Sequence, residues 1–312
     1  MFIVEVFATS HVGRVRQGNE DNYLLLDLAR LNTWTSSQEP SEFIVETQRF
    51  EINANGAVLA VSDGMGGALA GEVASQMAVE TVSKRLLDTD PDSTISPDVF
   101  GNSLVEKLFE STVYSNHLIH RQGRSDPKFS GMGATFTGAT ITPESIDLVQ
   151  VGDSRAYLIR NSQITQLTKD QSLVQQLIDA QQIQAADAET HPLKNVILQA
   201  LGAQNEVYPV PARIFPNQND ILLICTDGLS NKLKSSEMLA IVMQNIDNLG
   251  QAAAHLVRDA NENGGEDNIT VILAKLIGDN LPNATEEQVM IHQLNFGNIH
   301  DTSDQEDTAE IL

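Results

Sequence analysis

The sequence predicts an α+β fold in which two β-sheets pack together between outer layers of helices. Strand-like runs come in consecutive groups and helix-like runs come in pairs, whereas an alternating α/β fold would interleave them. The strand runs, such as "ILLIC" and "TVILA", are apolar throughout, so both faces of each sheet are expected to be covered. Two packed sheets with helices outside satisfy both observations.

The expected elements follow from apolar spacing, which repeats at helical intervals in some segments and marks short β-branched or aliphatic runs in others. Strands are expected at 3–9, 22–28, 56–63, 133–141, 145–160, 163–168, 220–226 and 268–276. Helices are expected at 68–88, 97–121, 235–243 and 249–262, with one or two short helices in 170–190.

Two segments lie outside this pattern. Residues 29–55 are polar with little periodicity and are expected as a long insertion between strands. Beyond residue 279 the chain has seven acidic residues and no lysine or arginine, which predicts a flexible acidic tail over 279–312. The folded domain is therefore expected to span 1–278.

Composition limits the classes of function. The chain of 312 residues is 41% hydrophobic and has a formal net charge of -23, which argues against nucleic acid or an anionic membrane as the main partner. The single cysteine, Cys225, excludes an internal disulfide and fits a reducing cytoplasm. Neither a signal peptide nor an apolar run of membrane-spanning length is apparent, so we expect a cytoplasmic protein.

Acidic residues recur at the edges of apolar runs. Four places set them beside glycine or asparagine, and a fifth lies between two strands; they are Glu20 with Asp21, Asp63, Asp227, Asp267, and Asp153. Each place alone is more typical of a turn. Strand ends can converge on one edge of packed sheets, where uncompensated carboxylates would repel one another. An all-oxygen cluster favours Mg²⁺ or Mn²⁺ over zinc.

Two further residues extend this interpretation. Gly64 lets the backbone turn after Asp63 and can offer its carbonyl oxygen to a metal. Arg16 precedes Asp21 by five residues, and a guanidinium near metal-bound carboxylates suits a phosphate group. Arg16 taken alone is more simply a surface arginine.

Other phosphate chemistries lack their motifs. A cysteine phosphatase needs an arginine six residues after its nucleophile, and the residue six after Cys225 is Asn231. The glycine-rich "GMGGALAG" has no P-loop lysine, and no Gly-x-Ser-x-Gly elbow occurs. His191 is the most notable of the seven histidines, but a helix-end or surface position is its simpler interpretation.

Eight separated motifs together resemble a known family. The segments "VRQGNED", "VSDGMGGALAGEVAS", "GMGAT", "VGDSRAYLIR", "QLTKDQSLVQQLI", "HPLKNVILQALG", "ICTDGLSNKL" and "GGEDNITVILA" occur in the order typical of bacterial protein phosphatases of the 2C (PPM) type. The similarity runs from about residue 5 to 276 and leaves out 29–55 and the tail. It implies a four-layer α-β-β-α sandwich of two antiparallel sheets flanked by helix pairs, with metals at one end.

The resemblance also implies roles for individual residues. Asp63, Asp227 and Asp267 would hold one ion, and Asp63 with the Gly64 carbonyl would hold the second, assisted by Glu20 and Asp21. Asp153 with Asp227 would form a third, weaker site. Arg16 would bind the substrate phosphate.

Two residues depart from the family pattern. Met65 stands where some members have a histidine proposed to protonate the leaving group, so that proton must come from water or another group. Gln171 stands where many relatives have histidine, in a segment, about 168–195, that corresponds to the family's mobile flap.

The predicted function is dephosphorylation of phosphoserine and phosphothreonine in proteins, with Mn²⁺ or Mg²⁺ as cofactor. A water or hydroxide bridging two ions would attack phosphorus directly, no phosphoenzyme would form, and a Ser/Thr kinase would be the natural counterpart. Two alternatives remain open: a non-catalytic module that binds metal or phosphoprotein, and a phosphodiesterase that acts on small nucleotides.

Overall fold

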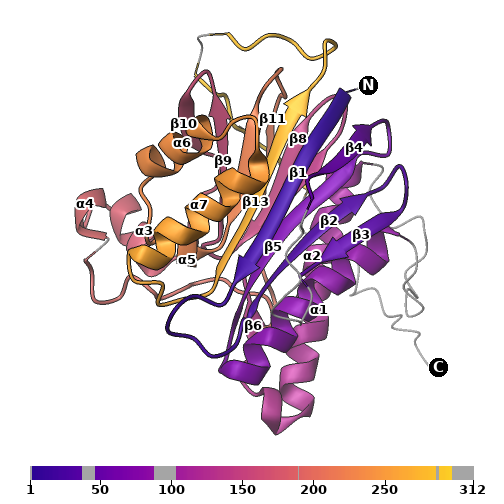
Figure 1. Ribbon diagram of the computed structural model, residues 1–312. Coiled ribbons are helices and arrows are strands. Elements are labelled where there is room, and N and C mark those ends of the chain that lie inside the picture. Colours follow the sequence, from indigo (N-terminus) through magenta and orange to yellow (C-terminus); the bar gives the residue numbers. More distant parts are fainter. Residues whose placement is uncertain (1, 37–45, 88–102, 189, 286–287, 297–312) are drawn as a thin grey trace, which may run out of the picture.

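Two antiparallel sheets face each other in the computed structural model, and helices cover the outer face of each sheet (Figure 1). The structure describes residues 2–36, 46–87, 103–188, 190–285 and 288–296. One sheet has the strand order β10-β9-β12-β13-β1-β4 and the other has the order β14-β11-β8-β7-β5-β2-β3, with β6 paired to β5. Pairings between described strands are antiparallel throughout. The predicted four-layer α+β fold is therefore observed.

The elements have the following bounds. The strands are β1 (Phe2–His11), β2 (Asp21–Asp27), β3 (Asn32–Thr35), β4 (Gln48–Ile52), β5 (Ala57–Met65), β6 (Gly133–Ala134), β7 (Phe136–Ile141), β8 (Ile146–Val151), β9 (Arg155–Arg160), β10 (Gln163–Gln166), β11 (Val210–Ile214), β12 (Ile221–Cys225), β13 (Ile269–Ile277) and β14 (His292–Gln293). The helices are α1 (Ala68–Leu86), α2 (Leu104–Ser125), the 3-10 turn η2 (Pro127–Phe129), α3 (Leu173–Asp179), α4 (Ala185–Ala188), α5 (Asp227–Ser230), α6 (Ser235–Gln244) and α7 (Leu249–Glu262).

Alternate residues of the buried strands enter different cores. In β2, Tyr23 and Leu25 pack between the sheets, whereas Leu24 and Leu26 pack toward α1 and α2. A third core lies between the smaller sheet and helices α6 and α7. Because side chains alternate across a strand and both faces are covered, the central strands read as continuous apolar runs. These cores hold the sheets in fixed register, which positions the loops at their ends.

Helix α2 begins later than the sequence spacing predicts. Its start at Leu104 follows a capping box in which Ser103 accepts from the Glu106 backbone and Glu106 accepts from the Ser103 backbone. Residues 97–102 of the predicted helix lie outside the described residues. No described helix is long and apolar enough to cross a membrane.

The expected long insertion at 29–55 takes part in both sheets. It contains β3, which pairs with β2 in one sheet, and β4, which pairs with β1 in the other. In β4 only Phe50 and Ile52 are buried, so the apolar signal is confined to two residues of a short edge strand. Residues 37–45 lie outside the description.

The first part of the predicted flexible tail is also packed. Leu281 is buried, Val289 and Ile291 pack against the core between the sheets, and β14 pairs with β11 at the edge of the larger sheet. Phe296 contacts Phe109 of α2 at a ring-centroid distance of 5.3 Å. Flexibility is therefore the wrong expectation for these residues, and 297–312 lie outside the description.

Candidate metal centre

The predicted acidic residues come from both sheets and meet at one end of them. Asp21 begins β2 and lies opposite Asp63 of β5 in the antiparallel register. Glu20 immediately precedes β2, and its carbonyl oxygen accepts from the Gly64 backbone N–H at 3.1 Å. The other three come from the smaller sheet's side and the β8–β9 connection; they are Asp153 between β8 and β9, Asp227 at the start of α5, and Asp267 before β13.

Gly64 has no room for a side chain. A Cβ there would clash with the carbonyl oxygens of Gly71 in α1 and of Glu20. Glycine therefore lets the first turn of α1 and the Glu20 backbone approach β5 closely beside Asp63. This close approach is a second reason for the glycine, in addition to the carbonyl ligand role predicted for it.

Two threonines from the smaller sheet fix the orientation of Asp21. The hydroxyls of Thr226 and Thr270 each donate to Asp21 Oδ2 at 2.7 Å. Thr226 Oγ1 also accepts from the Thr270 backbone N–H at 3.0 Å. The other oxygen, Asp21 Oδ1, is buried and has no hydrogen-bond partner in the described structure. One carboxylate oxygen is therefore held by the protein and the other is left for a ligand.

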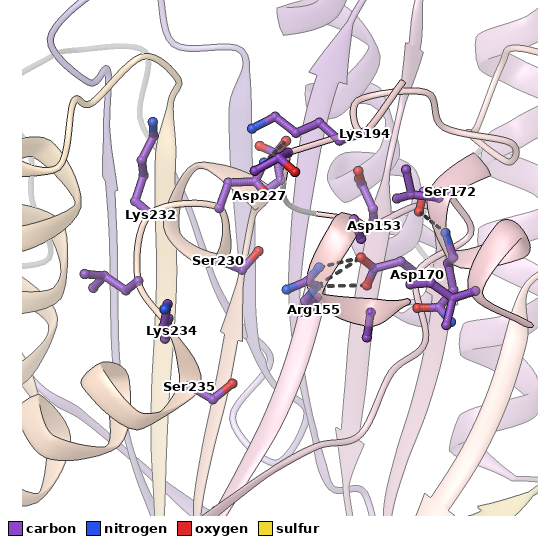
Figure 2. Close-up of a pocket in the computed structure, with 18 of the residues that line it drawn as sticks. Asp153, Arg155, Asp170, Ser172, Lys194, Asp227, Ser230, Lys232, Lys234 and Ser235 are labelled. Atoms are coloured by element: carbon purple, nitrogen blue, oxygen red, sulfur yellow. Dashed lines mark hydrogen bonds and ion pairs between the residues drawn. The ribbon is translucent and has the colours of Figure 1, made fainter. Parts of the chain in front are cut away.

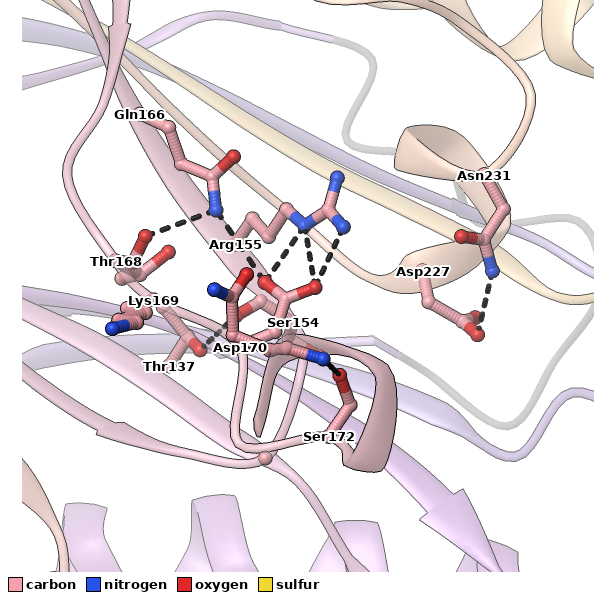
Figure 3. Close-up of polar contacts among 12 residues, drawn as sticks. Thr137, Ser154, Arg155, Gln166, Thr168, Lys169, Asp170, Ser172, Asp227 and Asn231 are labelled. Atoms are coloured by element: carbon pink, nitrogen blue, oxygen red, sulfur yellow. Dashed lines mark hydrogen bonds and ion pairs between the residues drawn. The ribbon is translucent and has the colours of Figure 1, made fainter. Parts of the chain in front are cut away.

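Asp153 and Asp227 also have an unpartnered oxygen. Each has a buried Oδ1 without a hydrogen-bond partner among the described residues. Oδ2 of Asp227 accepts from Asn231 Nδ2 at 3.0 Å (Figure 3). Buried polar atoms are nearly always satisfied, so three unsatisfied carboxylate oxygens at one end of the molecule call for an external partner.

The electrostatics of the cluster are unfavourable without a cation. Burial raises the pKa of Asp63 well above its ordinary value, and the neighbouring Asp21 and Asp227 raise it further. Burial likewise raises the pKa of Asp21 to about 7, although the two threonine hydroxyls lower it in part. Burial and then Asp227 raise the pKa of Asp153 to about 7, and burial with Asp267 raises the pKa of Asp227 to about 6. Each carboxylate thus makes its neighbours harder to ionise.

Arg16 lies at the mouth of this cluster. Its guanidinium pairs with the Asp267 carboxylate at 3.0 Å, and its side chain is 46% exposed. Its pKa is raised by Asp267, Glu20 and Asp63 against the opposing effect of burial. Arg16 therefore faces both solvent and the acidic residues, as a phosphate-binding arginine requires.

The described residues fit a hard divalent ion in charge and donor type. The donors are carboxylate and carbonyl oxygens, which Mg²⁺ and Mn²⁺ prefer. No three Asp, Glu, His or Cys side chains of the described ranges are grouped closely enough to enclose an ion as they stand. The Asp267 side chain pairs with Arg16 instead.

Sequence reasoning missed the residues that support the site. Asn268 accepts from the Glu20 backbone N–H at 2.8 Å and donates to the carbonyls of Val12 and Gly18, which fastens the loop carrying Arg16. Asn268 and the two threonines all lie inside motifs already noted, next to assigned aspartates. In the sequence, each of these residues could have been recognised as a polar residue within a predicted apolar strand or directly before one.

The residues that depart from the family pattern have structural roles. The side chain of Gln171 accepts from the Gly152 backbone N–H at 2.7 Å and donates to the Tyr208 carbonyl at 3.0 Å. It therefore ties the start of the flap segment to the loop of Asp153. Met65 ends β5 opposite Gly133. His191 Nδ1 accepts only from the nearby Leu193 backbone N–H, which fits its interpretation as a local turn residue.

Comparison with known proteins identifies the family. The profile of the family described as "Protein phosphatase 2C" matches residues 46–259. The chain belongs to the protein phosphatase 2C family. It is 37% identical over 228 residues to the serine/threonine phosphatase stp of Listeria monocytogenes, covering 72% of this chain and 87% of that protein. It is 37% identical over 223 residues to the protein phosphatase PhpP of Streptococcus pneumoniae, covering 72% of this chain and 87% of that protein.

Solved structures agree with the family assignment. The Mycobacterium tuberculosis serine/threonine phosphatase PstP/Ppp superposes with a TM-score of 0.68 at 30% identity, covering 88% of this chain and all of that one. The catalytic domain of PstP in complex with two manganese ions has a TM-score of 0.68 at 29% identity, with 89% and 100% covered.

These findings confirm the predicted family, the sandwich fold, the phosphatase class and a divalent-metal cofactor. The ligand assigned to each position, and a third ion, stay predictions.

Proposed function

We propose that this 2C-family phosphatase is a metal-dependent protein phosphatase acting on phosphoserine and phosphothreonine, and that it reverses the signal of a Ser/Thr kinase. The proposal rests on one observation above the others. Asp21, Asp153 and Asp227 each keep a buried, unpartnered oxygen at the sheet end where Arg16 lies. The names of the relatives, serine/threonine phosphatases among them, support this substrate class.

The ion-binding residues that we propose are those that the resemblance to the family implies. Asp63, central to the cluster, would be shared between two ions, with Asp227 and Asp267 on one and the Gly64 carbonyl on the other. Glu20 and Asp21 would complete the set, and Asp153 with Asp227 would form a third site. When bound, the ions lower the pKa of water to give a nucleophile near neutral pH and offset negative charge on the phosphoryl group.

The chain's own residues orient the substrate and do not attack it. Arg16 would exchange its contact with Asp267 for the phosphoryl oxygens, which a guanidinium holds by two parallel hydrogen bonds. Cys225 cannot serve as nucleophile, because it is buried in β12 and burial raises its pKa to about 12. Met65 carries no acidic proton, so the leaving alkoxide would take its proton from water or another group. The proposed reaction is direct hydrolysis without a phosphoenzyme.

The test is hydrolysis of a phosphothreonine peptide with Mn²⁺, then with a chelator, then by Asp227→Asn. We expect turnover only in the first case. Activity that survives both treatments contradicts the proposal. Peptide binding without turnover indicates a binding module, and faster hydrolysis of a phosphodiester than of a monoester indicates a phosphodiesterase.

A further inference from the structure

A groove of about 800 Å³ extends from the acidic cluster along the molecule (Figure 2). Asp153 and Asp227 of that cluster line it. One side is formed by the flap segment with α3 and α4, and the other by α5, the loop after it and the start of α6. A substrate whose phosphate reaches the cluster would have neighbouring residues in this groove.

Three lysines line the groove, although the chain as a whole is strongly acidic. They are Lys194 in the flap segment and Lys232 and Lys234 in the loop after α5. The full chain carries only 19 basic residues against 42 acidic ones. Arg155 also lines the groove, but its charge is already paired with Asp170. It binds that carboxylate through Nε and a terminal nitrogen at 2.6–3.1 Å (Figure 3). The lysines therefore carry the positive charge that a ligand would meet.

An acidic side chain of the protein already lies among these lysines. Glu266 forms an ion pair with Lys232, and its side chain is 59% exposed. The rim of the groove thus binds a carboxylate in the folded chain. Charged pairs at such exposed positions are each weak.

We propose that the groove binds the substrate chain beside its phosphorylated residue, and that Lys194, Lys232 and Lys234 select substrates with an acidic side chain there. The inference rests on the proposed function and adds a substrate preference to it. The net charge of -23 would by itself favour basic substrates. The groove lysines favour acidic substrates, so the two preferences can be distinguished by experiment. The acidic group is a carboxylate or a second phosphate.

The experiment uses phosphothreonine peptides identical except for the residues flanking the phosphothreonine, which are glutamate, glutamine or lysine on both sides. The full-length Mn²⁺-loaded protein should hydrolyse the glutamate peptide with the highest kcat/KM. The ratio of kcat/KM for the glutamate peptide to kcat/KM for the glutamine peptide should fall about two- to fivefold in each of Lys194→Gln and Lys234→Gln. The change should lie in KM, because the contact is made equally in ground and transition states.

Controls separate charge selection from general damage. Lys107→Gln, on α2 and outside the groove, should keep the wild-type ratio. Because the readout is a ratio of two peptides in one variant, a general loss of activity cancels. A peptide with a flanking phosphoserine distinguishes the two sources of acidity: a larger ratio than for glutamate identifies a second phosphate as the preferred group.

A variant with the opposite sign sharpens the test. Glu266→Gln removes the internal carboxylate and should raise the glutamate-to-glutamine ratio about two- to fivefold. Preference for the lysine peptide, or a ratio unmoved by all three groove variants, would overturn the inference. Failure of the proposed function looks different, because then neither p-nitrophenyl phosphate nor any of the peptides is hydrolysed.

Discussion

Two groups of aspartates in this molecule are satisfied in different ways. Away from the metal centre, both oxygens of Asp220 accept from Arg160 at 2.8 and 2.6 Å, and both oxygens of Asp147 accept from Arg213 at 2.5 and 2.9 Å. At the metal centre, Asp21, Asp153 and Asp227 each keep one oxygen without a partner. The residue type is the same, so the difference lies in the source of the positive charge.

This difference separates structure from function. When a buried carboxylate is paired with an arginine, folding of the chain by itself compensates its negative charge. A buried cluster without its own cation is stable only if it takes up protons or binds ions from solution. The first region should therefore govern unfolding, and the second should govern metal binding and activity.

Asp227→Asn should have the largest effect on activity. Because it removes a shared ligand, we expect hydrolysis to fall by roughly a thousandfold or more, with weaker Mn²⁺ binding. The metal-free protein should not lose stability, because one of several mutually repelling carboxylates is gone. Hydrolysis of p-nitrophenyl phosphate and urea unfolding in chelator measure the two effects. A destabilised metal-free variant would contradict the comparison.

Asp220→Asn should lower the stability of the protein and leave its metal binding nearly unchanged. It leaves Arg160 without its ionic partner in a site where the aspartate side chain is 0% exposed, and we expect a loss of about 3–5 kcal/mol in the free energy of unfolding. Urea denaturation measures the loss, and isothermal titration with Mn²⁺ should show little change in affinity. A variant as stable as wild type would show that the pair is not structural.

Thr226→Val should weaken Mn²⁺ binding without removing a ligand. The hydroxyl that orients Asp21 is lost while the shape is kept, and loss of such outer contacts typically costs about 10- to 100-fold in metal affinity. Titration calorimetry measures the dissociation constant, and Thr226→Ser, which keeps the hydroxyl, should bind as wild type does. Equal weakening in both variants would assign the effect to packing.

Metal stabilisation should grow with pH. Burial raises the pKa values of Asp21 and Asp153 to about 7, so the folded metal-free protein holds protons that the unfolded chain releases near pH 4. Its stability therefore falls as pH rises from about 4 to 7. Bound ions replace these protons. The difference in Tm between Mn²⁺-loaded and chelated protein should be larger at pH 7.5 than at pH 5.5; a constant difference would contradict it.

Phe296→Ala should have the smallest effect. It removes an edge-to-face ring contact with Phe109 on the far side of the larger sheet, and we expect a loss of about 1 kcal/mol or somewhat more in unfolding free energy. Urea denaturation of the two single variants and the double Phe109→Ala/Phe296→Ala variant isolates the pair. Activity should not change, and a large loss of activity would link the tail to the metal centre.

The sequence predicted the elements that are long or buried on both sides. Strands β5, β12 and β13 and helices α1 and α7 lie close to their expected bounds, because a continuous apolar run or a helical repeat marks each. Strands β3, β4, β11 and β14 were missed. Strand β11 contains Pro211, which argues against a strand, and β14 has two residues whose apolar neighbours supply most of the packing.

The acidic residues of the site were predictable, but their supporting contacts were not. An aspartate beside glycine at the end of an apolar run can be recognised from the sequence alone. The hydroxyls that hold Asp21 come from positions 205 and 249 residues away and depend on how one sheet sits on the other. Arg16 contacts Asp267 across 251 residues for the same reason.

The pairing of β1 with β13 has a consequence for how the protein is made. Ile3 lies opposite Ile277, so β1, which can pair with β4 early, finds its second neighbour only when almost the whole domain exists. At about 5–20 residues per second on the ribosome, the intervening chain takes roughly 15–55 s to appear. Asp267 and Asn268 directly precede that late strand. A nascent chain without this segment therefore lacks the contacts of Asp267 with Arg16 and of Asn268 with Glu20.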